Sequence, residues 1–174
     1  MGSPIGAAIV FDDGYTHFGR ALVLAIAIIA LIAGQLRDNS LMTGPEIGAV
    51  SPLFIVKNVP ATLAFYRDRL GFDITFQGPE PSDIFFGIVQ RGHAMIMFKA
   101  VDVEPVPNHT RDIGHVIARW DAYVYVPDPD ALAAEFSSRG VEFFEPLQNN
   151  SDNLRGFEIE DVNGYVLYFG RPIT

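Results

Sequence analysis

The chain of 174 residues contains no cysteine. Disulfide bonds, thiolate metal sites and a cysteine nucleophile are therefore excluded. Basic residues are also scarce, because 12 lysines and arginines stand against 21 acidic residues, giving a formal charge of −9. Nucleic-acid binding rewards basic patches, so we do not expect nucleic acid as a partner, whereas an acidic balance is compatible with a cationic ligand. The sequence also lacks a nucleophile elbow, a phosphate-binding loop and a dinucleotide-binding fingerprint.

One long apolar run, ALVLAIAIIALIAG, occupies residues 21–34. Its 14 residues are fewer than the roughly 20 that a membrane span needs, and they suit the core of a signal peptide, although the acidic Asp12 and Asp13 precede it. Three readings stay open: an anchor or export segment, upstream sequence ahead of a start near Met42, and a helix packed on the domain. The protein is expected to be cytoplasmic if translation starts near Met42. Otherwise it is membrane-anchored or exported, with membrane contact confined to residues 21–36.

What the sequence does contain is an internal repeat with an offset of about 70 residues. Residues 51–72 and 121–141 share a short apolar strand, a helix-like segment and a closing glycine, and these glycines, Gly71 and Gly140, are 69 residues apart. A repeated unit of this size cannot cover its own apolar face, so the two copies are expected to pack together. The cleft between them is the first place to look for a functional site.

The repeat divides the chain into a leader and linker, residues 1–47, and a domain, residues 48–174, with modules at about 49–100 and 119–172. Each module is predicted to be βαβββ, which makes the fold class α+β. The predicted helices run from Asn58 to Gly71 and over 129–138. The predicted strands are 54–56, 72–77, 83–90, 94–99, 122–126, 141–144, 156–160 and 165–169.

This arrangement resembles the glyoxalase / bleomycin resistance / extradiol dioxygenase family, also called the vicinal oxygen chelate superfamily. The resemblance covers about residues 50–172, and its carriers are 57–59, 65–68, 70–72, 128–135, 139–141, 156–158 and 161–165. It implies a cupped mixed sheet with the helices on its outer face, and a homodimer. The family includes lyases, dioxygenases, epimerases, transferases and drug-binding proteins, so the resemblance indicates the fold more strongly than the activity.

The resemblance also implies four positions where metal-dependent members place their ligands, on the first and last strands of each module. Counted onto this sequence, they are Ser51, Ile96, Asp121 and Tyr168. Only Asp121 is a good ligand for a divalent cation, and one carboxylate cannot hold a catalytic metal, so we expect neither a metal nor a cofactor. The alternative is a metal enzyme with displaced ligands, in which Asp121 acts with His109 or His115. His17 and His93 are interpreted as solvent-exposed residues.

Strand alternation places Asp121, Tyr123 and Tyr125 on one face, and the same counting directs Ile96, Phe98 and Tyr168 inward. The predicted ligand-binding residues are Ser51, Ile96, Phe98, Trp120, Asp121, Tyr123, Tyr125 and Tyr168. A cavity lined by aromatic rings and one carboxylate suits a flat, apolar and cationic molecule. In the opposing interpretation the tyrosines fill a core and Trp120 lies in a core or an interface.

Two functions follow from this cavity. The favoured one is a metal-independent protein, similar to bleomycin resistance proteins, that sequesters an aromatic and cationic small molecule in the cleft between the modules. The alternative is a lyase or isomerase of the glyoxalase type, with or without a divalent metal. In the metal-free form, Asp121 and either Tyr123 or Tyr168 act as acid and base. Turnover of the bound molecule distinguishes the two functions.

Overall fold

The computed structural model describes residues 48–111 and 120–173. The chain divides into two units, Met1–Ala49 and Val50–Thr174, and every described element lies in the second. The apolar run at 21–34, His17 and His115 lie outside the described residues. No helix in the part of the chain that the structure describes is long and apolar enough to cross a membrane.

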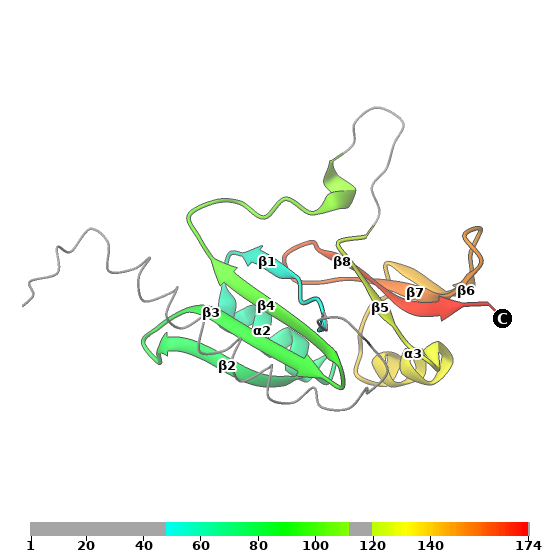
Figure 1. The fold of residues 1–174 in the computed structure, drawn as a ribbon, viewed down its shortest axis with the longest axis horizontal. Helices are drawn as coiled ribbons and strands as arrows, with labels where there is room; N and C mark the ends of the chain where they lie inside the picture. The colour runs from blue at the N-terminus through cyan, green and yellow to red at the C-terminus, as the bar shows by residue number, and fades with distance from the viewer. Residues whose placement is uncertain (1–47, 112–119, 174) are drawn as a thin grey trace, which may run out of the picture. The chain divides into compact units, whose positions relative to one another are not determined.

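Both modules have the predicted βαβββ order (Figure 1). The first consists of β1 (Leu53–Val56), α2 (Val59–Asp68), β2 (Asp73–Glu80), β3 (Asp83–Arg91) and β4 (Ala94–Ala100). The second consists of β5 (Ala122–Tyr125), α3 (Pro129–Ser138), β6 (Glu145–Asn149), β7 (Leu154–Glu160) and β8 (Val166–Pro172). A 3-10 helix, η1 (Asn108–Thr110), lies in the connector between them.

The strands form two four-stranded sheets with the orders β1-β4-β3-β2 and β5-β8-β7-β6. In each sheet one pair of neighbouring strands is parallel, β1 with β4 and β5 with β8, and the other pairs are antiparallel. The predicted α+β class and the two mixed modules are thus confirmed, with two sheets described in place of one continuous sheet.

The two helices begin and end with the same local chemistry. The Asn58 and Asp128 side chains accept hydrogen bonds from backbone N–H groups in the first turns of α2 and α3, and a proline lies in each first turn. The chain then leaves each helix through Gly71 and Gly140, whose φ values are +67° and +69°. Glycine adopts this left-handed conformation without the steric cost that a Cβ imposes. The repeat in the sequence therefore corresponds to two helices that begin and end in equivalent ways.

One strand prediction was wrong. Residues 141–144 alternate in a strand-like way, but the strand that pairs with β7 is β6, which starts at Glu145. Val141 and Phe143 instead pack against the hydrophobic core from an irregular segment. β6 contains Pro146 and is an edge strand of its sheet, a position where the missing N–H of proline is tolerated.

The hydrophobic core lies between the sheets and the helices. In the first module the ring of Phe98 on β4 lies 4.7 Å from that of Tyr66 on α2. In the second, Phe169 on β8 lies 5.4 Å from Phe136 on α3. Since successive residues of a strand point to opposite faces, the residues next to Phe98 and Phe169 face away from the helices.

Contacts of several kinds join the modules. Stacked rings of Phe54 and Tyr165 lie 4.4 Å apart, and the Tyr66 hydroxyl donates to Asp161 Oδ2 at 3.1 Å. A third contact, between β3 and α3, is the ion pair of Arg91 with Glu135 at 2.6 Å. The modules therefore share a core, as the repeat predicted.

Candidate functional site

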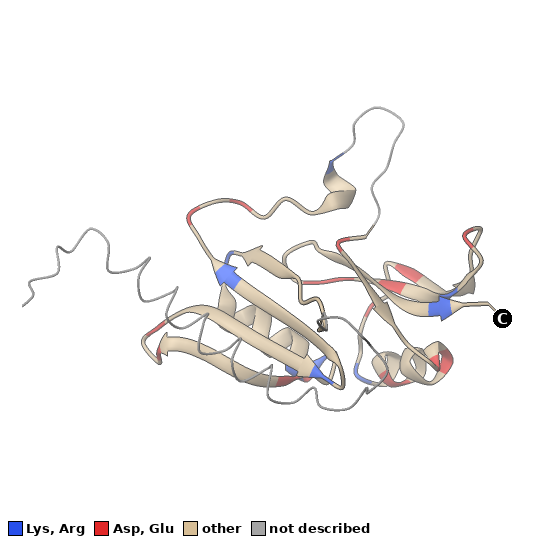
Figure 2. Ribbon diagram, in the orientation of Figure 1, with Lys and Arg blue, Asp and Glu red and all other residues tan. Residues whose placement is uncertain are grey.

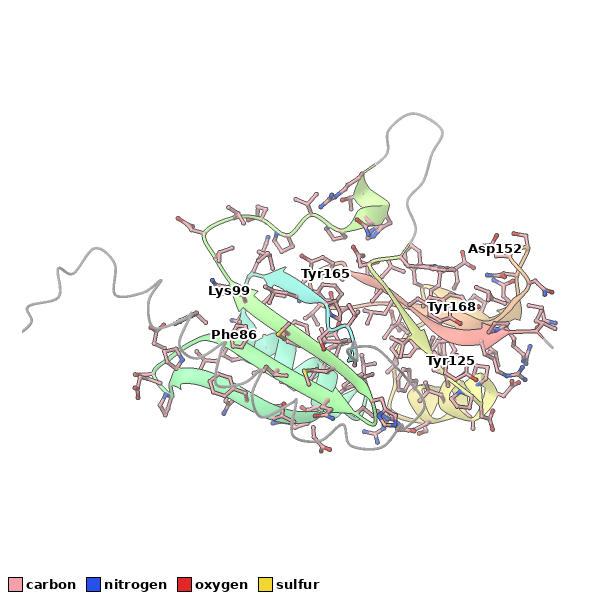
Figure 3. All side chains as sticks on the ribbon, in the orientation of Figure 1. Phe86, Lys99, Tyr125, Asp152, Tyr165 and Tyr168 are labelled. Carbon is pink, nitrogen blue, oxygen red and sulfur yellow. The ribbon has the colours of Figure 1, made fainter. Side chains whose placement is uncertain are left out.

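Three aromatic rings cluster on the second module, on the side of the sheet away from α3. The ring of Tyr168 lies 4.4 Å from that of Trp120 and 5.6 Å from that of Tyr123, to which it is almost parallel at 13°. Tyr125 follows on the same side of β5 (Figure 3). Tyr123 and Tyr125 remain 43% and 63% exposed, so this surface offers rings to a partner. We call these four residues, together with Glu158, the aromatic face.

Strand register brings the aromatic face together. Tyr123 pairs with Tyr168 across β5 and β8, and Tyr168 pairs with Glu158 across β8 and β7. Paired residues point to the same side of a sheet, so the three side chains form one row. Ala122 and Val124 point the other way and pack against the core, as strand alternation predicted.

Two glycines provide the space for Tyr168. Gly156 and Gly170 pair directly across β7 and β8, in the row next to Tyr168. A Cβ atom added to either glycine would lie only 2.6 Å from the Tyr168 side chain. The Tyr168 ring therefore lies close to the backbone at these glycines, and the rings of Trp120 and Tyr123, 6.1 Å apart from each other, both adjoin it.

Glu158 is a site residue that the sequence interpretation missed. Its side chain is only 7% exposed, and Trp120 Nε1 donates a hydrogen bond of 2.6 Å to its Oε1. Among the residues that the structure describes, none of the ion pairs includes Glu158. Its alternation with Ile159 and Glu160 was a signal, but only the register of β7 against β8 reveals that it faces Tyr168.

The carboxylate of Asp121 connects two segments of the backbone. Its Oδ1 accepts from the backbone N–H of Asn108 and its Oδ2 from that of Val166, both at 2.8 Å. The carboxylate thus ties the connector to the start of β8. Both oxygens accept backbone hydrogen bonds, so Asp121 has a structural role, and its predicted role in ligand binding stays a prediction.

The first module differs from the expectation for Ile96 and Phe98. Phe98 is fully buried against α2, and Ile96, on the same side of β4, is 2% exposed. Met97 pairs with Leu53 as Tyr168 pairs with Tyr123, so Met97 is the structural counterpart of Tyr168. Counting four residues from each turn glycine selected Ile96, because Tyr168 lies four residues after Gly164 whereas its counterpart Met97 lies five residues after Gly92. Such an error moves a side chain to the other face of the sheet.

The donor set at the four family positions does not fit a divalent metal. Ser51 and Met97 are poor ligands, Tyr168 is a phenol, and both oxygens of Asp121 are engaged by amides. Across 48–111 and 120–173, no three histidine or acidic side chains come together to hold an ion. His109 lies in η1 with its ring 5.7 Å from that of Phe144, away from any such group.

A hollow of about 230 Å³ lies beside the aromatic face. Its lining combines both modules and includes Val50, Pro52, His93, Met95, Tyr123 and Tyr125. Ser51, which stands between Val50 and Pro52, is half-buried. Drug-sized ligands usually occupy about 300–1,000 Å³, so the hollow can hold one part of a small molecule whose remainder lies on the exposed tyrosines.

Charge is divided unequally between the modules. Residues 50–100 contain five basic and four acidic side chains, whereas residues 120–173 contain three arginines and ten carboxylates. Figure 2 shows acidic residues on α3, on β7 and in the turn between β6 and β7 of the second module. The aromatic face therefore belongs to the module that attracts cations.

Both central tyrosines are neutral at ordinary pH. Burial raises the pKa of the Tyr168 hydroxyl above its usual value, and the nearby Tyr123 and Glu158 raise it further. Burial also raises the pKa of Tyr123, whose hydroxyl donates to the Gly170 carbonyl at 3.0 Å. The phenols thus offer rings and hydrogen-bonding oxygens, and the negative charge of the face comes from Glu158.

Comparison with known proteins places this geometry in a family. The profile of the Glyoxalase/Bleomycin resistance protein/Dioxygenase superfamily matches residues 47–169. No curated protein matches the chain in sequence.

Among solved structures, the bleomycin-binding protein from Streptomyces verticillus, in complex with copper(II)-bleomycin, is 26% identical with a TM-score of 0.53. The match covers 73% of this chain and 97% of that one. A bleomycin-binding protein complexed with bleomycin is 19% identical, with a TM-score of 0.54 and coverage of 72% and 98%. A superfamily member from Sphaerobacter thermophilus is 18% identical, with a TM-score of 0.53 and coverage of 74% and 98%. The last two likenesses concern the fold alone.

Proposed function

The chain belongs to the glyoxalase/bleomycin resistance protein/dioxygenase superfamily, and we propose that it binds a flat, cationic small molecule at the aromatic face without changing it chemically. The observation that carries the proposal is the cluster of the Trp120, Tyr168 and Tyr123 rings beside Glu158, a buried residue whose carboxylate accepts from the Trp120 indole. Aromatic rings attract a cation through their electron-rich faces, and a carboxylate adds a full charge of the opposite sign.

Two further observations support a cationic ligand. Most of the acidic excess of the chain lies in the module that carries the aromatic face. The 26% identical neighbour is a bleomycin-binding protein, in a structure with copper(II)-bleomycin. We therefore place the ligand between the exposed tyrosines and the hollow, where Met95 of the first module meets Tyr123 and Tyr125. Ser51 and Ile96 stand at the border of this site, and Phe98 is left out of it.

Binding is favoured over the lyase or isomerase alternative by the state of the acid and base groups. That alternative relies on Asp121 with Tyr123 or Tyr168 to move protons. Both oxygens of Asp121 accept backbone N–H groups, and the Tyr123 hydroxyl donates to a backbone carbonyl. The raised pKa values of the two phenols also disfavour their action as bases at neutral pH.

The experiment uses a matched pair of probes. At neutral pH 4-(dimethylamino)quinoline is a flat cation, and 1-(dimethylamino)naphthalene is its neutral counterpart. Calorimetric titration should give saturable binding of one cation per chain, tighter than the naphthalene by about 1 kcal/mol. Trp120 is the sole tryptophan, so its fluorescence should change along the same isotherm. Mass spectrometry of the recovered probe should show no product.

Two variants locate the probe. Tyr123→Ala should weaken the binding of the cation by about 1–2 kcal/mol, since it removes one ring of the stack. Val162→Ala removes an exposed apolar side chain in the turn between β7 and β8, and it should leave binding unchanged. Saturable binding that leaves Trp120 fluorescence and the Tyr123→Ala variant unaffected would place the ligand elsewhere. Chemical conversion of the probe would favour the enzyme.

A further inference from the structure

Glu158 is a buried residue whose carboxylate has one hydrogen-bond donor and no cationic partner among the described residues. One oxygen accepts from the Trp120 indole, and that bond is the sole hydrogen bond or ion pair of its carboxylate within the described residues. Burying an ionised carboxylate is costly unless it is paired and hydrogen-bonded. A neutral indole N–H fixes the direction of the carboxylate without neutralising it. The arrangement thus holds an oriented negative charge inside a surface of aromatic rings.

The hydroxyl of Tyr168 is a second polar group that lacks a partner. Tyr168 is 2% exposed, and its hydroxyl is a buried side-chain atom without a hydrogen-bond partner. Glu158 is the residue directly paired with Tyr168 across the sheet, but their side chains do not bond to each other. An unpaired buried hydroxyl is destabilising, so its retention calls for an explanation.

Tyr168 cannot relieve this cost by moving toward the sheet. The hydroxyl lies over Gly156, so close that a Cβ there would approach it to 2.6 Å. On the other side lies the ring of Trp120, 4.4 Å away between centroids. The Trp120 indole thus lies next to both the Tyr168 ring and the Glu158 carboxylate, to which it donates a hydrogen bond.

One kind of chemical group could serve as a partner for both the Glu158 carboxylate and the Tyr168 hydroxyl. An N–H bond on a positive nitrogen can donate to the phenol oxygen or the carboxylate, and its charge compensates Glu158. A neutral ring supplies no charge, and a fully alkylated nitrogen supplies charge but no donor.

The structure assigns to Glu158 and Tyr168 a recognition site for a protonated N–H nitrogen, such as that of a quinolinium, an amidinium or an aryl-ammonium group. The ligand reaches it by displacing the edge of the Trp120 ring. This inference rests on the proposed function and makes it more specific: the ligand is not only flat and cationic but carries its charge on a nitrogen with at least one hydrogen.

The test compares two cations of nearly the same shape. Protonated 4-(dimethylamino)quinoline carries a ring N–H, and 1-methyl-4-(dimethylamino)quinolinium carries a methyl group in its place. The intact chain should bind the N–H cation about tenfold more tightly, the value of one hydrogen bond to a charged donor. Trp120 emission should shift with both probes and more strongly with the first.

Tyr168→Phe is the informative variant because it removes an unpaired hydroxyl and keeps the stacked ring. It should not lower the melting temperature, and it should reduce the preference for the N–H cation over the methylated one at least threefold. Glu158→Gln keeps an acceptor for the Trp120 indole but removes the charge, and it should weaken both cations about tenfold or more. Val162→Ala again serves as the unaffected control.

The outcomes separate this inference from the proposed function. If both cations bind equally, or if Tyr168→Phe leaves their ratio unchanged, the recognition site is refuted while binding of flat cations stands. If neither cation binds or alters Trp120 fluorescence, the proposed function fails, and this inference fails with it.

Discussion

Both carboxylate oxygens of Asp121 accept hydrogen bonds from backbone N–H groups, one in the connector and one at the start of β8. Asp121→Asn keeps one acceptor and turns an N–H₂ group toward an N–H donor. It should therefore lower the free energy of unfolding by about 1–3 kcal/mol, the cost of leaving a buried donor unpaired. Urea denaturation measures this, and the affinity for 4-(dimethylamino)quinoline should change little.

Asp128 provides the matched control. Its Oδ1 caps α3 by accepting from the Ala131 N–H at 3.0 Å, and asparagine caps a helix about as well as aspartate. Asp128→Asn should therefore be close to neutral for stability. If Asp121→Asn is equally neutral but weakens the cation, then Asp121 contributes charge to the site and its bonds to the backbone are dispensable.

A second carboxylate makes stability depend on pH. Burial is the main cause that raises the pKa of Asp161 above its usual value, while hydrogen bonds from Asn163, Tyr165 and Tyr66 oppose the rise. A raised pKa means that the folded state binds the proton more tightly than the unfolded state. This contribution is therefore present below the unfolded pKa and is lost as pH rises through the folded pKa.

Asp161→Asn should remove that dependence with little change in shape, since its oxygen can still accept the N–H groups of Asn163 and Tyr165. Chemical denaturation at a series of pH values tests it. Relative to the variant, the natural chain should be more stable at pH 4 than at pH 7. A difference between the two proteins that stays constant with pH, or grows as pH rises, would contradict the raised pKa.

For single residues, the sequence indicated which face of a strand a side chain lies on, but not which residues of other strands it contacts. Alternation along residues 122–125 correctly separated the tyrosines from Ala122 and Val124. The predicted facing of Phe98 was wrong because it depended on counting through a turn of unknown length. Glu158 was missed because its neighbours lie on other strands, and their register is a property of the folded sheet. Roles in ligand binding stay predictions.

At the scale of elements, the close pairing of Gly156 with Gly170 sets how β7 and β8 support the aromatic face. A Cβ at Gly170 would lie 2.5 Å from the Arg155 carbonyl oxygen and 2.6 Å from the Tyr168 ring. Backbone must move to admit it, so Gly170→Ala should cost about 1–3 kcal/mol of unfolding free energy, as overpacking does. It should also disturb Trp120 fluorescence by shifting Tyr168.

Gly92 offers a contrasting turn position. An added Cβ there meets nothing within 4 Å, and its φ of +58° is a conformation that asparagine tolerates. Gly92→Asn should therefore cost little and leave Trp120 unchanged. Equal losses in the two variants would show that the close approach at Gly170 is not what limits substitution.

Elements were predictable where local chemistry defines them. Asn58, Asp128 and the two closing glycines fixed both helices from the sequence. β6 was not predictable, because Glu145–Asn149 is polar, contains a proline and lacks strand propensity. It is a strand only because β7 offers it hydrogen-bonding partners.

For the whole molecule, residues 1–41 should be dispensable for folding. Every described element lies within Val50–Thr174, and the leader shares no pattern with the repeat. A chain starting at Met42 should keep the urea midpoint and the probe affinity of the full chain. Aggregation or unfolding of the shorter chain alone would show that the leader belongs to the core.

The chain should also form a homodimer. Leu53 on β1 is 49% exposed and Tyr125 on β5 is 63% exposed, and each strand is the first of its sheet. Exposed apolar side chains that gather at sheet edges are typical of interfaces. Light scattering at micromolar concentration should give about twice the 19.1 kDa of one chain. A monomer mass at that concentration would contradict the prediction.

The unequal division of charge gives the folded domain an electric dipole, since ten carboxylates and three arginines lie in residues 120–173 and a nearly balanced set in residues 50–100. An external field exerts a torque on such a molecule as well as a force. Near an anionic bilayer or a nucleic acid, the torque turns the second module outward, and the aromatic face with it. The proposed binding surface is thereby turned away from such polyanions while remaining open to diffusing cations.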